Sequence, residues 1–312
     1  EVAELLVKHS FADKVFFCNS GAEANEAAIK LARKWGKQFS PPKYKIISLE
    51  GSFHGRTIAT ITATGQQKVK HGFEPLLPGF VHVPFDNIKA IEEVIDNETV
   101  AIMVEPIQGE GGIRIPSPRY LKKIRKICDE NQVLLIFDEI QTGMGRTGTL
   151  FAYEHEGVKP DILTLAKSLA NGLPIGAMLA KTEITNAFSR GSHASTFGGN
   201  PVSCAAAKAV MKILTTTEIL EYAKQIGSFL KEKLNQLKEK HQIIKEIRIS
   251  GLMVGIELDT KAQPIVEKCL QRGFLINAVQ ENVLRLLPPL IIEREAIEAF
   301  IEVLDNILRE SQ

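Results

Sequence analysis

Seven short apolar runs, with helical patterns between them, constrain the fold of this chain more than any other feature. Each run is continuously apolar, as is typical of strands that are buried on both faces. The runs occupy residues 15–18, 45–49, 80–83, 100–105, 133–139, 161–166 and 175–180, and helical patterns lie at 23–36, 87–96 and 118–131. We therefore predict an α/β fold with a mostly parallel seven-stranded sheet covered by helices.

The pattern changes in the last third of the chain. A long helical region begins at Asn200-Pro201 and continues to about residue 240. Beyond it we expect a smaller α+β unit, with Pro288-Pro289 as a turn before the final helix. Its predicted strands are 243–249, 252–258, 274–277 and 283–287, and its predicted helices are 262–272 and 293–309. The sequence thus predicts a large domain at 1–214 and a small domain at 215–312.

Composition excludes several functional classes. The net charge of +1 gives no global field that would attract nucleic acid or a membrane surface. No apolar stretch approaches the roughly 18 residues that a membrane span needs. The four cysteines lie far apart and form no metal-ligand spacing, so we expect reduced thiols and no metal in a cytoplasmic protein.

One stretch, LLIFDEIQTGMGRTG at 134–148, contains the pattern G-x-G-x-x-G. A dinucleotide fingerprint needs its first glycine directly after the strand, a helix after the third glycine, and an acidic residue about 20 residues later. Here Ile140 to Thr142 separate the acidic pair from the first glycine, no helical period follows, and the next apolar run ends in a lysine. We predict a flexible turn without a nucleotide.

Two charged residues follow neighbouring apolar runs. Asp138 follows one run and Lys167 follows the next, where ligands bind in open α/β sheets. Such an aspartate can also be a helix cap or an ion-pair partner, and most lysines are solvated. Small and apolar neighbours around Lys167 would lower its pKa and favour a neutral, nucleophilic amine.

Two further segments complete a pattern. Ser20 and Gly21 join an apolar run to a helix whose free N–H groups can hold a phosphate, although an ordinary serine cap has the same sequence. Phe53 and His54 lie between glycines, where flat rings can cover a ligand or form a buried aromatic contact. A phosphate cradle, rings, a carboxylate and a lysine together describe pyridoxal 5'-phosphate (PLP) held as a Schiff base.

The motifs NSGAEANEAAIKLAR, SFHGRT, EPIQGEGG, FDEIQTGMGRTG, LAKSLANGLPIGA and STFGGNP resemble those of the class III, or omega, aminotransferases among the fold-type I PLP enzymes. Within that family they resemble the acetylornithine branch most. The resemblance runs through essentially the whole chain. It implies an enzyme that transfers the terminal amine of N2-acetyl-L-ornithine to 2-oxoglutarate, giving N-acetylglutamate 5-semialdehyde and L-glutamate, as in arginine biosynthesis.

The resemblance also implies a role for each cofactor residue. Lys167 would carry the cofactor and act as the acid and base, and Asp138 would keep the pyridine nitrogen protonated. Gln141 would bind the phenolic oxygen. The remaining contacts would come from Ser20, Gly21 and Ala22 to the phosphate, and from Phe53 and His54 to the ring.

Substrate contacts follow from the same resemblance. Arg56 and Arg285 would bind the substrate carboxylates, and Glu110 would pair with Arg285 while the omega-amino donor is bound. Thr196 would reach the phosphate of a neighbouring subunit, and Ser195 would contact substrate across that interface. The resemblance therefore implies a homodimer with shared active sites.

Several alternatives stay open at this level. The related ornithine, succinylornithine and 4-aminobutyrate aminotransferases carry similar motifs, and an aminomutase or a decarboxylase has the same fold. Family members also have a segment before the residues that match Glu1, which predicts a partial or truncated chain. A chain of that kind could instead be an inactive binding or assembly protein.

Overall fold

The structure, a computed structural model, describes residues 1–310 and contains two sheets. The large sheet has seven strands in the order β1-β7-β6-β5-β4-β2-β3. Its strands are β1 (Lys14–Cys18), β2 (Lys45–Leu49), β3 (Phe80–Val83), β4 (Thr99–Val104), β5 (Leu134–Asp138), β6 (Ile162–Leu165) and β7 (Gly176–Ala180). Only β7 runs antiparallel to its neighbours, β1 and β6. The predicted mostly parallel sheet is confirmed.

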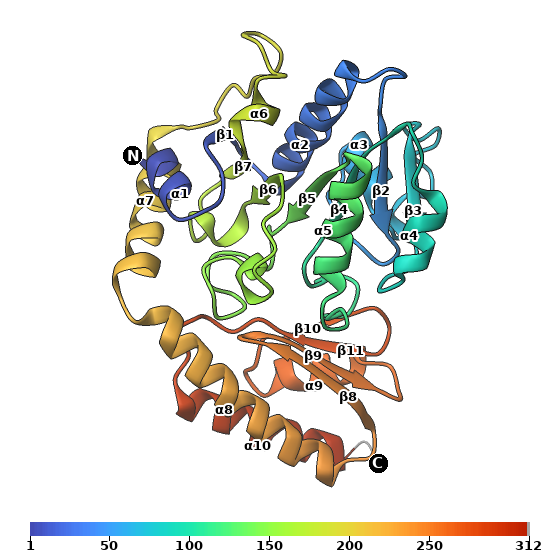
Figure 1. The fold of residues 1–312 in the computed structure, drawn as a ribbon. Helices are drawn as coiled ribbons and strands as arrows, with labels where there is room; N and C mark the ends of the chain where they lie inside the picture. The colour runs from blue at the N-terminus through green and yellow to red at the C-terminus, as the bar shows by residue number, and fades with distance from the viewer. Residues whose placement is uncertain (311–312) are drawn as a thin grey trace.

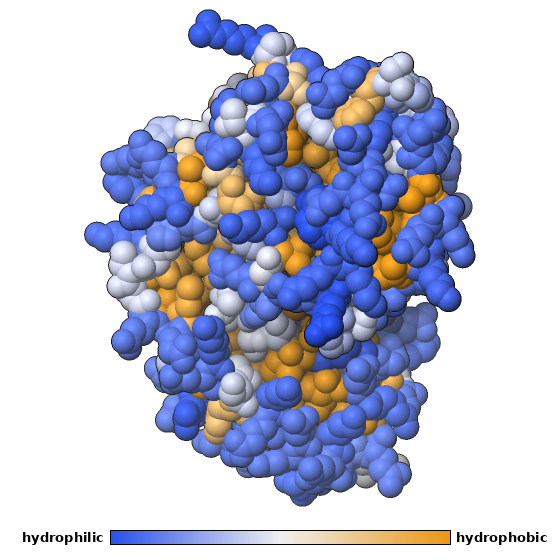
Figure 2. Space-filling view, in the orientation of Figure 1, coloured by the Kyte–Doolittle hydropathy of each residue, from blue (hydrophilic) through white to orange (hydrophobic). Residues whose placement is uncertain are grey.

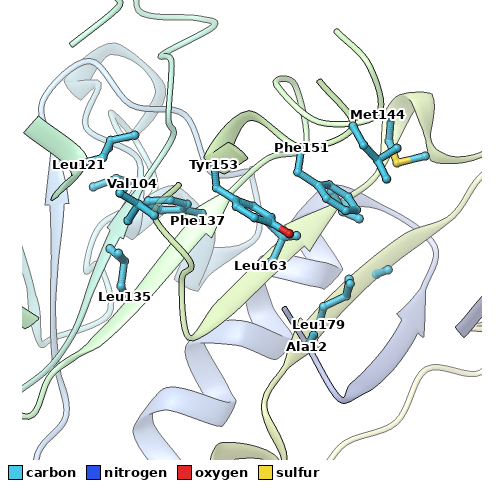
Figure 3. Close-up of a cluster of buried hydrophobic side chains, with 14 of the residues drawn as sticks. Ala12, Val104, Leu121, Leu135, Phe137, Met144, Phe151, Tyr153, Leu163 and Leu179 are labelled. Carbon is cyan, nitrogen blue, oxygen red and sulfur yellow. The ribbon is translucent and has the colours of Figure 1, made fainter. Parts of the chain in front are cut away.

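Alternate residues along the central strands pack on opposite faces of the large sheet, as the two-residue period of a strand requires. Leu135 and Phe137 face one core with helices α4 and α5, whereas Leu134 and Ile136 face the other core with α2 and α3. Figure 3 shows the first core around Phe137. The helices of this part are α1 (Val2–Lys8), α2 (Gly21–Trp35), α3 (Ile58–Ala63), α4 (Ile88–Val94), α5 (Tyr120–Asn131) and α6 (Thr182–Thr185).

The small sheet is antiparallel, with four strands in the order β10-β11-β9-β8. It contains β8 (Ile244–Ser250), β9 (Met253–Leu258), β10 (Asn277–Val279) and β11 (Val283–Leu286), with helices α8 (Ile219–Lys240), α9 (Gln263–Gln271) and α10 (Arg294–Arg309). Helix α7 (Pro201–Thr216) precedes them and packs through Ala207, Met211 and Leu214 into a core of the large sheet. The sheet lies between the large sheet and helices α8 and α10 (Figure 1). Hydrophilic side chains cover the outer surface of these two helices (Figure 2). A separate hydrophobic core here supports the proposed division after residue 214.

Two predicted elements differ in the structure. The single helical region at 201–240 is two helices, because the chain becomes extended at Thr217 (φ −123°, ψ 170°). The hydroxyls of Thr215, Thr216 and Thr217 bond to carbonyls four residues earlier, each at 2.7 Å, and such bonds compete with helix continuation. The strand predicted at 274–277 lies instead at Asn277–Val279, since Phe274 and Ile276 pack into the small core.

Short connections complete the chain. Four 3-10 helices lie at η1 (Gly36–Gln38), η2 (Gln67–Val69), η3 (Ala152–His155) and η4 (Lys167–Leu169). Within residues 1–310, every helix is too short or too polar to span a bilayer.

The small core should depend on the apolar face of α10. Leu304 is fully buried there. Leu304→Ala should reduce the free energy of unfolding by about 2–5 kcal/mol, because the truncation removes apolar contacts and leaves a cavity. Denaturant unfolding measures this loss. Glu302→Ala, on the exposed side of the same helix, is the control and should change stability by less than about 0.5 kcal/mol.

Candidate active site

The carboxyl ends of several strands meet at one edge of the large sheet and surround a cavity of about 440 Å³. Asp138 ends β5, and Lys167 follows β6 by two residues. Ser20 follows β1, and Phe53 lies in the loop after β2. All four residues line the cavity, so the structure brings together the segments that the sequence analysis singled out separately.

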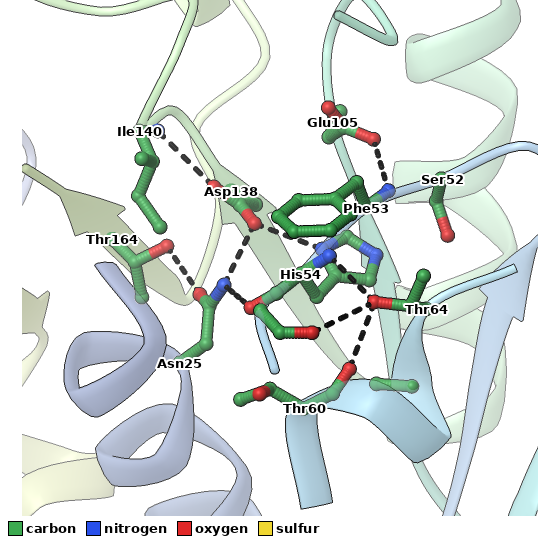
Figure 4. A network of polar contacts seen from close by, with 12 residues as sticks. Asn25, Ser52, Phe53, His54, Thr60, Thr64, Glu105, Asp138, Ile140 and Thr164 are labelled. Carbon is green, nitrogen blue, oxygen red and sulfur yellow. Dashed lines mark hydrogen bonds and ion pairs between the residues drawn. The ribbon is translucent and has the colours of Figure 1, made fainter. Parts of the chain in front are cut away.

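The Asp138 carboxylate is buried and fully hydrogen-bonded (Figure 4). Its Oδ2 accepts from Asn25 Nδ2 at 2.8 Å and lies 2.8 Å from His54 Nδ1, while its Oδ1 accepts from the backbone N–H of Ile140 at 3.1 Å. Asn25 also donates to the His54 carbonyl at 2.7 Å and accepts from the Thr164 hydroxyl at 2.7 Å. These contacts fix the carboxylate in one orientation.

The adjacent acidic residue, Glu139, has a different role. Successive residues at a strand end point to opposite faces, so Glu139 turns away from the cavity. Its carboxylate accepts from the backbone N–H groups of Ala152 and Tyr153 at 2.6 and 2.8 Å. Burial raises the pKa of Glu139 to about 8. Glu139 therefore anchors η3, and Asp138 alone serves the cavity.

The N-terminus of α2 opens into the cavity. Ser20 caps the helix by accepting from the N–H of Glu23 at 3.2 Å. The first N–H groups of a helix have no intrahelical partner, which leaves those of Gly21 and Ala22 available to an anion. A side chain at position 21 would crowd Ile140, because its Cβ would lie 2.7 Å from Ile140 Cδ1. This end of the cavity is suited to a phosphate group.

Lys167 supplies the only amine that lines the cavity within the part of the chain that the structure describes. Its backbone has φ of +46°, a left-handed conformation that concentrates at functional sites. The side chain is exposed to the cavity, and partial desolvation by the surrounding protein lowers the pKa of Lys167. The carboxylates of Asp138 and Glu105 act in the opposite direction but do not cancel this effect.

A three-residue cluster lies where the two sheets meet. Arg285 on β11 donates from Nη1 to Glu110 Oε1 at 2.7 Å and to Gln141 Oε1 at 3.4 Å. Gln141 donates to Glu110 Oε1 at 3.2 Å. Burial opposes ionisation of Glu110, but the hydrogen bond and charge of Arg285 hold the pKa of Glu110 below its usual range. Arg285 is therefore a buried cation with one carboxylate partner.

Nine predicted residues line the cavity itself: Ser20, Gly21, Ala22, Phe53, His54, Arg56, Asp138, Gln141 and Lys167. Glu110 and Arg285 lie beside it, through their bonds to Gln141. Ser195 and Thr196 line a second hollow, and Ser195 Oγ accepts there from Asn19 Nδ2 at 3.1 Å. Their predicted role concerns a neighbouring subunit and stays a prediction.

The sequence analysis missed Asn25 and Glu105. Asn25 is a fully buried polar residue on the alanine-rich face of α2, and that break in the apolar pattern was the available signal. Glu105 follows β4, and its carboxylate accepts from the N–H groups of Phe53 and Gly109 at 2.9 and 3.2 Å. Burial raises the pKa of Glu105 to about 7. Glu105 thus holds the loop that presents the Phe53 ring.

The chain resembles known proteins along its whole length. A family model described as class III aminotransferase matches residues 1–308. The chain is 54% identical over 312 residues to the acetylornithine aminotransferase of Caldanaerobacter subterraneus, which covers 99% of this chain and 79% of that protein. It is 51% identical over 313 residues to the acetylornithine aminotransferase of Methanocaldococcus jannaschii, with 99% and 78% covered.

Solved structures of aminotransferases also match the chain. The ornithine aminotransferase from Toxoplasma gondii ME49 matches with a TM-score of 0.95 and 36% identity, covering 99% of this chain and 76% of that one. The N-acetylornithine aminotransferase from Stenotrophomonas maltophilia matches with a TM-score of 0.86 and 36% identity, covering 99% and 79%.

The lowered pKa of Lys167 should be visible in its reactivity. A lower pKa gives a larger neutral fraction at any pH below the ordinary lysine value of about 10.4. In protein freed of small molecules, acetic anhydride labelling of Lys167 should therefore reach its half-maximal rate at a lower pH than labelling of Lys159, an exposed lysine outside the cavity. Peptide mass spectrometry measures both rates. Equal midpoints would contradict the desolvation argument.

Proposed function

Because this chain belongs to the class III aminotransferases and is a transaminase, we propose that it transfers the terminal amine of N2-acetyl-L-ornithine to 2-oxoglutarate. The products are N-acetylglutamate 5-semialdehyde and L-glutamate. One observation carries the proposal: the Lys167 amine and the Asp138 carboxylate face the same cavity from adjacent strand ends. The identity of 46–54% to acetylornithine aminotransferases supports the substrate over ornithine, succinylornithine or 4-aminobutyrate.

The residues of the cavity fit PLP. Gly21 and Ala22 offer free N–H groups to the phosphate, and a side chain at position 21 would crowd Ile140. Phe53 offers a ring face, and Lys167 offers the amine that would carry the cofactor. When bound, PLP supplies an electron-withdrawing ring that stabilises negative charge on the substrate carbon next to the transferred nitrogen.

Two residues of the chain move or hold protons. Lys167 Nζ takes the proton from the substrate carbon that bears the amine, and its lowered pKa keeps the neutral, basic form available. Asp138 would keep the ring nitrogen of bound PLP protonated, because its negative carboxylate, held in place by Asn25 and His54, would stabilise the positive charge there. The buried network around Asp138 also excludes water from this side of the cavity.

Arginines hold the substrate carboxylates, since a guanidinium can bind a carboxylate through two parallel bonds. Arg56 is exposed in the cavity wall, with its Cζ 5.8 Å from the Phe53 ring centroid. Arg285 is held by Glu110 and serves 2-oxoglutarate once that bond opens. Gln141 bonds to both members of the pair and would also hydrogen-bond the phenolic oxygen of bound PLP.

A homodimer and a cytoplasmic location are part of the same proposal. Thr196 and Ser195 lie in the second hollow, near the exposed side chain of Phe197. In a dimer these residues would complete the partner's site, with Thr196 on its phosphate and Ser195 against its substrate. Neither nucleic acid nor a membrane is needed for this reaction.

A comparison of amino donors tests the function. With PLP and 2-oxoglutarate, kcat/KM for acetylornithine should exceed that for ornithine by roughly tenfold, about 1.4 kcal/mol. Acetylation removes the positive charge of the α-amine, which lowers repulsion by the arginines of the site. Lys167→Ala is the control and should lose at least about 10³-fold in rate. A folded protein that shows no visible absorbance band with PLP would overturn the proposal.

The Glu110–Arg285 pair should control the choice of donor. Glu110→Gln leaves Arg285 without a charged partner, so 2-oxoglutarate and glutamate should bind roughly tenfold more tightly relative to acetylornithine. Steady-state KM values measure this ratio. Glu257→Gln, which removes the 2.5 Å ion pair to Arg248 outside the cavity, is the control and should leave the ratio unchanged. An unchanged ratio in Glu110→Gln would count against the pairing role.

A further inference from the structure

Residues 143–148 carry the G-x-G-x-x-G pattern that we interpret as a turn without a nucleotide. This turn contacts the small sheet. Met144, Gly145 and Gly148 all have positive φ, at 58°, 89° and 93°. The resulting tight turn begins two residues after Gln141 and packs on the turn between β8 and β9. The turn therefore joins the cavity wall directly to the small sheet.

Arg146 lies at the centre of this turn, and its guanidinium hydrogen-bonds to backbone carbonyls. Its Nη1 donates to the carbonyls of Leu252 at 3.1 Å and Pro288 at 2.5 Å. Its own carbonyl accepts from the N–H of Leu252 at 3.0 Å. Burial lowers the pKa of Arg146, and no carboxylate opposes that effect. The guanidinium thus donates to two carbonyls at the edge of the small sheet, one just before β9 and one just after β11.

The two carbonyls lie where the ladder between β9 and β11 stops. The last pair in register is Leu286 with Val254, and two more steps in that register would set Pro288 opposite Leu252. Proline has no N–H to donate, so the ladder cannot continue through Pro288. Arg146 supplies the missing donor at this position. Its two hydrogen bonds connect the start of β9 and the end of β11 to the loop that follows β5.

Close backbone contact supports the same attachment. A Cβ at Gly251 would lie 2.4 Å from the Thr147 carbonyl carbon and 2.7 Å from the Gly148 nitrogen. Only glycine fits at this position, which also has φ of +55°. The two turns are therefore in direct backbone contact, so the turn that the sequence predicted to be flexible is packed against the turn between β8 and β9.

Strand β11 carries Arg285, the arginine proposed to bind a substrate carboxylate. Arg285 lies three residues before Pro288 and hydrogen-bonds to Glu110 and Gln141, where the two sheets meet. The partners of Arg285 and the donor Arg146 thus all lie in loops that follow β4 and β5 of the large sheet. We infer that Arg146 is a positioning residue that holds β11 so that Arg285 meets the acceptor carboxylate in the cavity.

This inference rests on the proposed role of Arg285 and is tested by Arg146→Met in the PLP-loaded enzyme. Misplacing a substrate-binding group by about 1 Å costs one to two orders of magnitude in rate. The KM for 2-oxoglutarate should therefore rise roughly tenfold, while the KM for acetylornithine changes less than about twofold. Backbone amides at 283–287 should exchange hydrogen roughly tenfold faster, because the strand end is released.

Two variants make the test specific. Arg146→Lys keeps a cationic donor, so it should restore part of the effect and raise the acceptor KM by only about threefold. Arg33→Met removes a half-buried guanidinium that donates to the Pro78 carbonyl at 2.6 Å, far from the small sheet. It should lower stability but change neither the ratio of the two KM values nor exchange at 283–287.

The outcomes separate the inference from the proposed function. Equal rises in both KM values, or unchanged exchange at 283–287, would overturn the positioning role of Arg146. If Arg146→Met does not fold, Arg146→Lys decides, and an unchanged KM ratio in that variant overturns it. If Arg285→Met leaves the 2-oxoglutarate KM unchanged, the role of Arg285 in the proposed function fails, and the exchange data still test whether Arg146 fastens β11.

Discussion

The buried carboxylate of Asp138 is the interaction on which the site depends. A charged group in this position must be hydrogen-bonded, because an unpaired buried charge costs several kcal/mol. Its partners come from three elements: Asn25 from α2, His54 from the loop after β2, and the N–H of Ile140 after β5. Meeting that requirement sets the position of the helix whose N-terminus receives the phosphate and of the loop that carries Phe53.

A second constraint acts between the two sheets. The Glu110–Gln141–Arg285 cluster contains a buried cation from one sheet and its carboxylate from the other. Such a pair is strong only in a well-defined geometry, so the sheets must be held in one relative position. A small core of Ile107, Ile113 and Met253 and the backbone contacts of Arg146 lie in the same contact region. The contact region between the two sheets thus contributes both to stability and to the placement of Arg285, which is proposed to bind substrate.

Local patterns predicted some elements better than others. The strands of the large sheet were found within about two residues, since burial on both faces leaves a continuous apolar run. The strand expected at 274–277 was misplaced because Phe274 and Ile276 are apolar for a different reason, their packing in the small core. Asn25 and Glu105 were missed because their importance comes from partners that are distant in sequence, Asp138 and the N–H of Phe53.

The sequence by itself determined the mostly parallel sheet and the residue types that follow its strands, because these depend on periodicity and on short local motifs. The order of the strands came only from the structure. Only the tertiary structure decided that Glu139 turns away from the cavity and anchors η3, and that Arg146 closes the end of the β9–β11 ladder. Both results depend on the packing of segments that are far apart in the chain, which no local pattern records.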